Sequence, residues 1–317
     1  MPHRQLAPGV EIVAVDGDGL AVRTADGEFL RVHTGDVNGD DLRHRLAGTP
    51  PTRPDTGLDR LVSAFDAASY LTDSGRTDSG RTGSARTGSA RTGSARTGSV
   101  PPSTTDEATE ATEVTDAAPA WPAARRDVLL LGDPALTEPL ARQLRAAGAS
   151  PRSGTPEDAM TRPDAAAVVW CLDGPVPDGL WDEADRLPER GTAWLRCHRE
   201  GWQAYLEPVA AAPGDVTSAH VRARRLAVTP AHRELAAYWS GPRTSGAPVP
   251  LTAAAAGLLA ALLADDLARW AADSPDTGAL PARRRLRRVD LRTLTVTEHP
   301  VLPVPDVART PAPTATS

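Results

Sequence analysis

Several common residue types are scarce or missing in this sequence of 317 residues. It contains no lysine, one isoleucine (Ile12) and only two cysteines, Cys171 and Cys197. Two cysteines cannot form a disulfide framework or, by themselves, a four-thiolate zinc site. All 35 basic residues are arginine, a bias that is typical of a GC-rich, actinobacterial genome. The formal charge of −6 disfavours a protein that mainly coats nucleic acid, because such proteins are usually strongly basic.

Long apolar segments are also missing. The most apolar stretch, Leu251 to Leu267, is too short to cross a bilayer and contains Asp265 and Asp266. Residues 1–9 carry no apolar segment of the kind that a signal peptide needs. These features predict a soluble, cytoplasmic chain.

The first 71 residues alternate between short apolar runs and turns. Three strand-like runs between Leu6 and Thr34 are separated by Asp-Gly turns at residues 16–19 and 25–27, which predicts a three-stranded antiparallel meander. A short helix capped by Asp36 and ending at Leu46 is expected next. A second helix is expected from Leu58, closing at Tyr70-Leu71. Three small strands with helices outline a winged-helix domain over residues 1–71.

Residues 72–120 differ completely in composition. The pentapeptide Arg-Thr-Gly-Ser-Ala repeats from Arg76 to Val100, and a stretch rich in Thr, Glu, Ala and Pro follows. A segment with so few apolar side chains cannot offset the entropy lost on ordering, so we expect a disordered linker. The Pro- and Thr-rich residues 308–317 are expected to be a disordered tail.

Residues 121–307 read as an α/β domain. Asp127–Gly132 is a continuous apolar run that ends in glycine, as in a buried parallel strand, and the helix Ala135–Ala147 should follow it. Further strands are expected at 165–171, 192–197, 202–206, 287–291 and 293–296, and a helical hairpin at 231–239 and 251–271. Strands that alternate with helices predict an open, Rossmann-type sheet.

The first strand of this domain lacks the features of a nucleotide site. Its turn, Gly132-Asp133-Pro134, has one glycine where a dinucleotide fingerprint has several. Pro134 removes a backbone donor, and Asp133 puts a negative charge where a phosphate would lie. We therefore expect a Rossmann-like sheet that does not hold a nucleotide.

Other candidate sites are weak. Cys197 and His198 are adjacent, so in a strand they would point to opposite faces and could not share a metal ion with His220. No serine has the Gly-x-Ser-x-Gly context of a nucleophile elbow. Asp265-Asp266 is interpreted as the solvated edge of a helix. The arginines at 283–285, 287 and 288 form either a solvated loop or a surface for an acidic partner.

The order of these parts, with several local segments, resembles one family. Leu6–Glu11, Arg126–Gly148 and the segment from Glu207-Pro208-Val209 to Pro213-Gly214 resemble parts of the leader-peptide-binding proteins of thiazole/oxazole-modified microcin (TOMM) pathways. So do Val289-Asp290-Leu291 and the His299–Leu302 segment near the end. These proteins are also called ocin-ThiF-like cyclodehydratase partners. The resemblance implies a peptide-recognition domain, a ThiF-like α/β domain and a protein that is not itself an enzyme.

The chain departs from this family at two places. The family binds structural zinc through two Cys-x-x-Cys pairs, but here the first pair falls on Ser218 and Val221, and no cysteine follows His299-Pro300. We therefore predict no zinc and no other cofactor. The family also has a helix where this chain has Pro-Pro-Thr-Arg-Pro-Asp between Thr49 and Gly57, so that helix is expected to be missing or very short.

The resemblance also implies a site and partners. An extended leader peptide would add a strand to the third strand, with its side chains in a groove against the last helix of the recognition domain. The α/β domain would dock on a YcaO cyclodehydratase, which performs the ATP-dependent ring formation; a homodimer is left open, and neither nucleic acid nor a membrane is expected as a partner. Arg31 and Arg60 could pair with acidic leader residues, whereas Leu61 and Phe65 could equally fill a small core. The expected edge residues are Phe29, Leu30, Arg31, Val32 and His33, and the expected groove residues are Leu58, Arg60, Leu61, Val62 and Phe65.

Two other classes of function remain open. One is a divergent adenylating enzyme of the ThiF type, which the turn at Gly132 disfavours. The other is a winged-helix DNA-binding regulator, which would need a basic recognition helix. Residues 58–71 carry one arginine against two aspartates, so they disfavour phosphate contact.

Overall fold

The computed structural model describes residues 4–15, 19–49, 55–73, 121–161, 164–274 and 280–304. The described residues on the two sides of the predicted linker belong to one compact unit. Residues 74–120 of that linker, and the predicted tail, lie outside the described residues. Thr72 and Asp73, which were assigned to the linker, lie in a short strand.

The predicted N-terminal meander is confirmed. Strands β2 (Glu11–Val15), β3 (Gly19–Arg23) and β4 (Phe29–Val32) pair antiparallel in sequence order. A fourth strand, β11 (Arg243–Ser245), joins β2 from far along the chain, so the sheet order is β11-β2-β3-β4. The β3–β4 hairpin closes where the amide of Thr24 donates to the carbonyl of Glu28 and Gly27 adopts a φ of +86°. That conformation strains a residue with a side chain, which accounts for glycine there.

Two helices and a small second sheet cover one face of this meander. Helix α1 spans Gly39–Leu46 and α2 spans Thr56–Ala67, while β1 (Arg4–Leu6) pairs with β5 (Leu71–Asp73). The predicted cap is corrected, because the side chain of Asn38, not Asp36, accepts the first amides of α1. The second helix also ends earlier than predicted: Ser69 has a φ of +61°, which turns the chain into β5. The family's additional helix was expected to be missing or very short between Thr49 and Gly57. Thr49 is not helical, and residues 50–54 lie outside the described residues.

The larger sheet has seven strands and confirms the α/β class. β6 (Asp127–Gly132), β7 (Ser150–Ser153), β8 (Ala167–Leu172) and β9 (Ala193–Glu200) run parallel. β10 (Gln203–Leu206), β12 (Arg285–Asp290) and β13 (Thr295–Pro300) continue the sheet antiparallel. The strand order is β13-β12-β10-β9-β8-β6-β7. The sheet is therefore mixed: the strands from β9 to β7 are parallel, and those from β10 to β13 are antiparallel.

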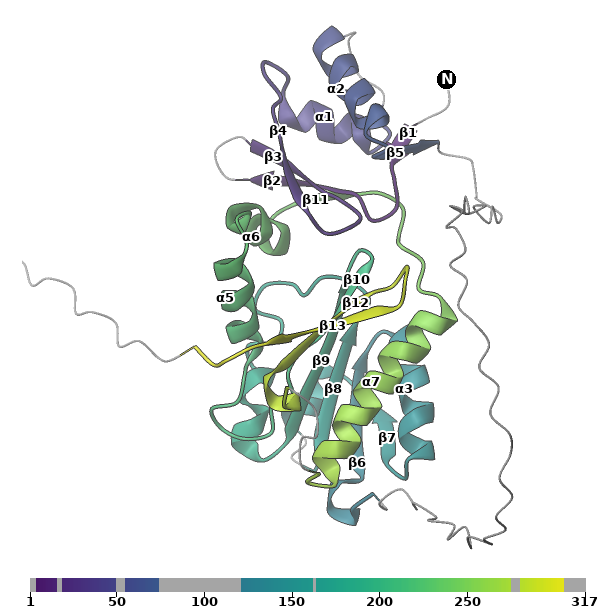
Figure 1. The fold of residues 1–317 in the computed structure, drawn as a ribbon, viewed down its shortest axis with the longest axis vertical. Coiled ribbons are helices and arrows are strands. Elements are labelled where there is room, and N and C mark those ends of the chain that lie inside the picture. The colour runs from purple at the N-terminus through teal and green to yellow at the C-terminus, as the bar shows by residue number, and fades with distance from the viewer. Residues whose placement is uncertain are drawn as a thin grey trace, which may run out of the picture. The chain divides into compact units, whose positions relative to one another are not determined.

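Helices cover both faces of this sheet (Figure 1). On one face α3 (Pro134–Ala146) packs against α7 (Ala253–Ala271) over the main apolar core. The other face is covered by α4 (Pro156–Thr161), the 3-10 helix η2 (Ala184–Arg190) and α5 (Ser218–Val228), while α6 (His232–Ser240) packs against α5 and β2. Short 3-10 turns at Ala123–Arg125 and Ala282–Arg284 complete the described elements. The predicted helical hairpin is wrong, because α6 packs on β2 and α5 whereas α7 packs on α3.

A cluster of three tryptophans fills the second face of the sheet. Trp170, Trp181 and Trp194 meet edge to face, with ring centroids 6.0 to 6.4 Å apart. Such geometry is preferred by aromatic quadrupoles and adds to the apolar burial. No helix within the described ranges is both long enough and apolar enough to span a membrane.

Candidate functional site

Strand β4 is the outer strand of its sheet, as predicted for the peptide-binding edge. Its register pairs Val32 with Leu20, Arg31 with Ala21, Leu30 with Val22 and Phe29 with Arg23. Hydrogen-bonded and non-bonded pairs alternate in an antiparallel ladder, and the Thr24–Glu28 pair is bonded. It follows that Leu30 and Val32 bond inward to β3, while the amides and carbonyls of Phe29 and Arg31 point away from the sheet. These outward groups are the ones that an added strand would pair with.

The two faces of β4 differ in their surroundings. Val32 packs against the core that α1 and α2 share with the sheet, and Leu30, on the same face, is 44% exposed. Phe29 and Arg31 point to the opposite face, where Phe29 meets the ring of Tyr238 of α6 edge to face. Among the described residues the outer edge of β4 thus has the exposed Leu30 on the side of α1 and α2, and an aromatic contact with α6 on the other.

The predicted groove residues fall into two groups. Leu58 and Phe65 are buried in the N-terminal core, so little of either side chain is left for a peptide. Leu61 and Val62 pack on the same core but remain half-buried. Arg60 is exposed and donates to the carbonyl of Thr56 within its own helix. His33, just after β4, is exposed as well. Of the predicted set, Phe29, Leu30, Val32, Leu61 and Val62 offer apolar surface.

Arg31 has an internal partner that the sequence did not indicate. Its guanidinium pairs with the carboxylate of Glu234 in α6, whose side chain is only 3% exposed. Burial raises the pKa of Glu234, but the hydrogen bond and charge of Arg31, together with a backbone hydrogen bond, lower the pKa overall. Glu234 is therefore a carboxylate at neutral pH, and Arg31 already has a counter-charge before any acidic peptide arrives.

A buried ion pair joins the four-stranded sheet β11-β2-β3-β4, called the N-terminal sheet below, to the α/β domain. Arg23 of β3 donates to the backbone carbonyl of Glu200 at 2.9 Å and lies 3.7 Å from the Glu200 carboxylate. Its other neighbour is Glu11 of β2, at 3.4 Å. Because Arg23 and Glu200 are each 1% exposed, their charges are compensated by protein groups rather than by water.

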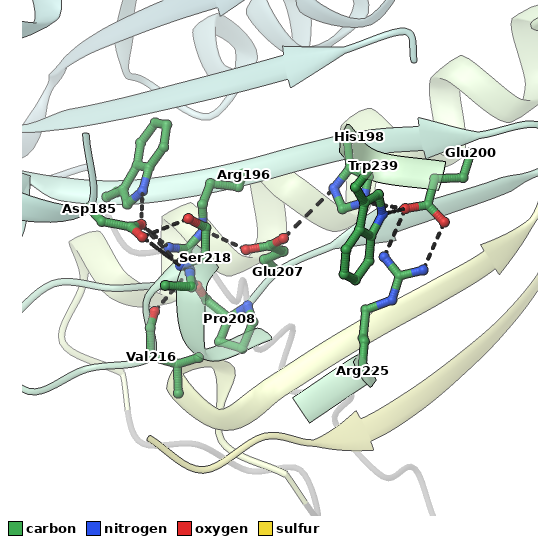
Figure 2. A network of polar contacts seen from close by, with 12 residues as sticks. Asp185, Arg196, His198, Glu200, Glu207, Pro208, Val216, Ser218, Arg225 and Trp239 are labelled. Carbon is green, nitrogen blue, oxygen red and sulfur yellow. Dashed lines mark hydrogen bonds and ion pairs between the residues drawn. The ribbon is translucent and has the colours of Figure 1, made fainter. Parts of the chain in front are cut away.

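Glu200 is the centre of a wider polar network on one face of β9 (Figure 2). Arg225 of α5 donates to both of its carboxylate oxygens, at 2.9 and 2.7 Å, and the indole of Trp239 donates at 3.0 Å. Burial raises the pKa of Glu200, but Arg225 and His198 hold it well below its ordinary value. Glu200 therefore remains ionised, and it ties β3, β9, α5 and α6 together.

The network continues along β9 to Arg196. The guanidinium of Arg196 donates to Asp185 at 2.9 Å and lies 3.1 Å from Glu207, and Asp185 also accepts from Ser218 at the start of α5. His198 lies between Glu200 and Glu207 (Figure 2). Burial raises the pKa of Glu207, although Arg196 and His198 act against it. No predicted site residue belongs to this network, because charged residues in a strand give no sequence signal for burial.

The turn after β6 is built for strand packing and not for phosphate. A Cβ on Gly132, whose φ is +99°, would lie 1.8 Å from the carbonyl oxygen of Cys171. The glycine is thus required by the close approach of β8. The Asp133 carboxylate caps α3 by accepting from the amide of Ala135, and Pro134 is the first helical residue. A phosphate at this helix N-terminus would meet that carboxylate.

The two positions where the sequence resemblance implies a first pair of zinc ligands, Ser218 and Val221, make other contacts. Ser218 bonds to Asp185, and Val221 is buried in an apolar cluster with Val301, Tyr205 and Leu286. Valine supplies no donor atom, so these residues do not fit a zinc ion. Cys197 faces the core under α3 and α7, whereas His198 stacks on Tyr205 on the other face, as predicted. A hydrogen bond to Cys197, with burial, raises the pKa of Cys171 well above its ordinary value.

Two interpretations of charged residues are corrected. Asp266 is not a solvated edge, because it is buried and pairs with Arg285, at 2.6 Å, and with Arg287. Asp265 is exposed and pairs with Arg269. The arginine cluster is likewise not a solvated loop, because most of its members pair with acids of the chain. Its members pair within the chain: Arg283 and Arg284 with Asp215, Arg285 and Arg287 with Asp266 and Glu298, and Arg288 with Gln203 and the carbonyl of Asp26.

No protein family and no curated protein matches the chain in sequence. Solved structures of similar fold include a heterocyclase in complex with substrate and cofactor, at 14% identity and a TM-score of 0.41, over 96% of this chain and 39% of that one. The E. coli microcin synthetase McbBCD complex matches at 12% identity and a TM-score of 0.40, over 96% and 99% of the two chains. E. coli MccB with MccA-N7isoASN matches at 10% and 0.43, over 96% and 98%. At these identities the likeness concerns the fold and assigns no role to any residue.

Proposed function

We propose that this chain binds the leader of a ribosomal precursor peptide along β4 and delivers it to a YcaO cyclodehydratase for azoline formation. The observation that carries the proposal is the free edge of β4, where the backbone groups of Phe29 and Arg31 point outward beside the exposed Leu30. An added strand gains main-chain hydrogen bonds there, and apolar side chains at the edge select its sequence. Holding the peptide raises its effective concentration at a partner's active site.

The chain's own part in this scheme is recognition, not catalysis. The turn at Gly132 serves strand packing, and the Asp133 carboxylate occupies the helix terminus where a nucleotide phosphate would bind. These two features disfavour the adenylating alternative. A rise in the melting temperature on adding ATP with Mg²⁺ would support that alternative instead.

The regulator alternative lacks a supporting surface. Helix α2 has acidic residues at Asp59 and Asp66, and its one arginine, Arg60, bonds to its own helix. Phosphate binding depends on clustered positive charge. The chain is similar in fold to the E. coli microcin synthetase McbBCD complex with pro-MccB17 bound. That likeness has a TM-score of 0.41, so the proposal depends on β4 alone.

The test uses the intact chain and a fluorescein-labelled peptide from the precursor gene beside it. Arg31→Pro removes the outward amide without touching the inward bonds of Leu30 and Val32 to β3. It should weaken binding by about tenfold, the usual effect of one lost hydrogen bond in such a site. Arg31→Ala is the matched control: it also removes the Glu234 contact but keeps the amide, and it should bind within about threefold of wild type. Absence of binding by the intact chain, with the YcaO partner also present, would overturn the proposal.

A further inference from the structure

A cleft of about 730 Å³ lies beside the Phe29 end of β4. It is bounded by the β3–β4 turn, by α5, α6 and the segment between them, and by the strands β10, β12 and β13. We refer to it as the α5–β13 cleft. Its volume lies in the range of sites that hold small molecules or several peptide side chains.

The α5–β13 cleft is lined mainly by apolar side chains. Tyr205, Val221, Leu286 and Val301, which pack together as one buried cluster, all contribute to its lining. Val228, at the end of α5, also lines it and is 80% exposed. A large apolar side chain exposed beside an apolar lining gains from being covered by a ligand.

Three arginines also line the cleft, and their charges are balanced differently. Arg225 is neutralised by its two hydrogen bonds to Glu200. Arg224 donates only to the backbone carbonyls of Leu302 and Pro303, each at 3.3 Å. Its guanidinium has no carboxylate within ion-pair distance among the described residues.

Among the described residues, Arg288, like Arg224, contacts only neutral acceptors. It donates to the side-chain oxygen of Gln203 at 2.9 Å and to the backbone carbonyl of Asp26 at 3.1 Å, and these acceptors are neutral. In the described part of the chain no acid pairs with it, and the one exposed acid at this cleft is Glu28. Two guanidinium groups thus line an apolar cleft with no counter-charge of their own, which favours a ligand that is both apolar and anionic.

We propose that the α5–β13 cleft binds a large apolar residue with a neighbouring acidic residue, in the part of the precursor peptide that continues past β4. This inference rests on the proposed function, because it assigns the next segment of the same peptide. The acidic side chain pairs with Arg224 or Arg288, and the apolar one covers the lining at Tyr205 and Leu286.

The position of Phe29 links the strand edge to the cleft. Phe29 is the first residue of β4, presents an outward amide, and lines the cleft together with Gly27 and Glu28. An extended chain rises about 3.3 Å per residue. A peptide paired with Arg31 and leaving the strand at the Phe29 end therefore reaches the cleft within about four residues. Strand pairing would fix the peptide's register, and the cleft would read one defined position in its sequence.

The first arm of the test examines the cleft without any peptide. The probe is 8-anilinonaphthalene-1-sulfonate, an aromatic anion whose fluorescence rises in apolar surroundings. It should bind the intact chain saturably, and the double variant Arg224→Gln/Arg288→Gln should weaken it by about tenfold. Arg142→Gln/Arg145→Gln removes two exposed arginines from α3, on the other face of the sheet, and should leave the probe's affinity unchanged.

The second arm uses the labelled precursor peptide. The peptide should displace the probe, and the cleft double variant should weaken peptide binding as well. Arg31→Pro should weaken the peptide but leave the probe's affinity unchanged, which separates the strand edge from the cleft.

Each other outcome overturns a different statement. If the peptide binds and responds to Arg31→Pro, but neither displaces the probe nor responds to the cleft variant, the cleft proposal is wrong and the strand-edge proposal stands. If the probe binds at the cleft but no peptide does, both peptide proposals are wrong and the cleft is a site for a small apolar anion. A probe that does not bind, or binds the cleft variant equally, contradicts the proposed chemistry of the cleft.

Discussion

Arg23 and Glu200 meet in the interior, where the Arg23 guanidinium donates to the Glu200 carbonyl at 2.9 Å and lies 3.7 Å from its carboxylate. Arg23 belongs to β3 of the N-terminal sheet, and Glu200 ends β9, the central strand of the larger sheet. Four elements converge on this one carboxylate, since Arg225, Trp239 and His198 contact it as well. Any movement of the N-terminal sheet against the α/β domain would have to break these contacts.

Removing Arg23 should therefore destabilise the protein strongly. Arg23→Met leaves Glu11 and Glu200 with one cation fewer in a buried site, and we expect a loss of about 3 kcal/mol in the free energy of unfolding. The measurement is urea denaturation followed by tryptophan fluorescence. Arg292→Met is the control, because Arg292 links Asp26 and Asp290 at the surface and should cost less than about 1 kcal/mol. An equal loss of unfolding free energy in the two variants would show that the buried Arg23–Glu200 pair contributes no more than a surface pair.

Glu200 and Glu207 should differ in their effect on acid stability. The ordinary pKa of both groups is 4.5. In the folded protein burial raises the pKa of Glu200, but Arg225 outweighs it together with His198 and the net pKa is lowered. The pKa of Glu207 is raised by its burial. The stability that Glu200 supplies is thus complete above pH 4.5 and lost as the pH falls toward its folded pKa. The contribution of Glu207 has the opposite sign: it favours the folded state below pH 4.5 and is lost as the pH rises through its folded pKa.

The matched amide variants test this difference. Glu200→Gln should cost about 3 kcal/mol at pH 7, because two arginines lose a buried carboxylate. It should also flatten the fall of stability between neutral pH and acid. Glu207→Gln should cost only about 1 kcal/mol, since an amide resembles the protonated acid. Denaturation curves at a series of pH values measure both, and similar pH profiles for the two variants would contradict the assignment.

A chelator should leave the fold intact. Val221 stands where the resemblance implies a zinc ligand and packs with Val301 in an apolar cluster, so EDTA should not change the melting temperature, and metal analysis should find no stoichiometric zinc. Stability at this place should depend on packing instead. Val221→Ala removes two buried methyl groups and should cost about 1.6 kcal/mol. A melting temperature that falls in EDTA would show that a metal is held after all.

Gly132 should tolerate no side chain. A Cβ there would overlap the Cys171 carbonyl, and the φ of +99° is unfavourable for any other residue, so Gly132→Ala should cost more than about 4 kcal/mol or prevent folding. Gly174 is the control, because a Cβ built on it meets nothing within 4 Å. Gly174→Ala should therefore fold with nearly unchanged stability, which circular dichroism and thermal melting would show. A stable Gly132→Ala protein would mean that the glycine has another purpose.

Much of the fold could be predicted because its elements carry local signals. The Asp-Gly turns and alternation between Leu6 and Thr34 gave the meander and its outer strand, and continuous apolar runs gave β6 and β8. Strand β11 could not be found in this way. Its residues, Arg243-Thr244-Ser245, have no apolar pattern, and they form a strand only because β2 offers them its backbone.

The polar interior escaped prediction for a related reason. A charged residue is expected outside, and it is buried only where the fold supplies an opposite charge from elsewhere in the chain. Asp266 is buried because Arg285 and Arg287 reach it from β12, and Glu200 because Arg225 reaches it from α5. These partners are not recognisable before the topology is known. The same holds for Glu234, which changes Arg31 from a free contact for the peptide into a paired group.

Strand β11 has a consequence for synthesis on the ribosome. The sheet that carries β4 takes its fourth strand from Arg243–Ser245, and α6, which holds Phe29 and Arg31, immediately precedes it. In a nascent chain that has emerged only as far as the repeats, β11 has not yet been made, so both β2 and β4 are open edge strands. The β2 edge closes late, when β11 has been made. Until then the growing chain has twice the opportunity for wrong strand pairing, and its highly polar repeats would keep such intermediates dispersed.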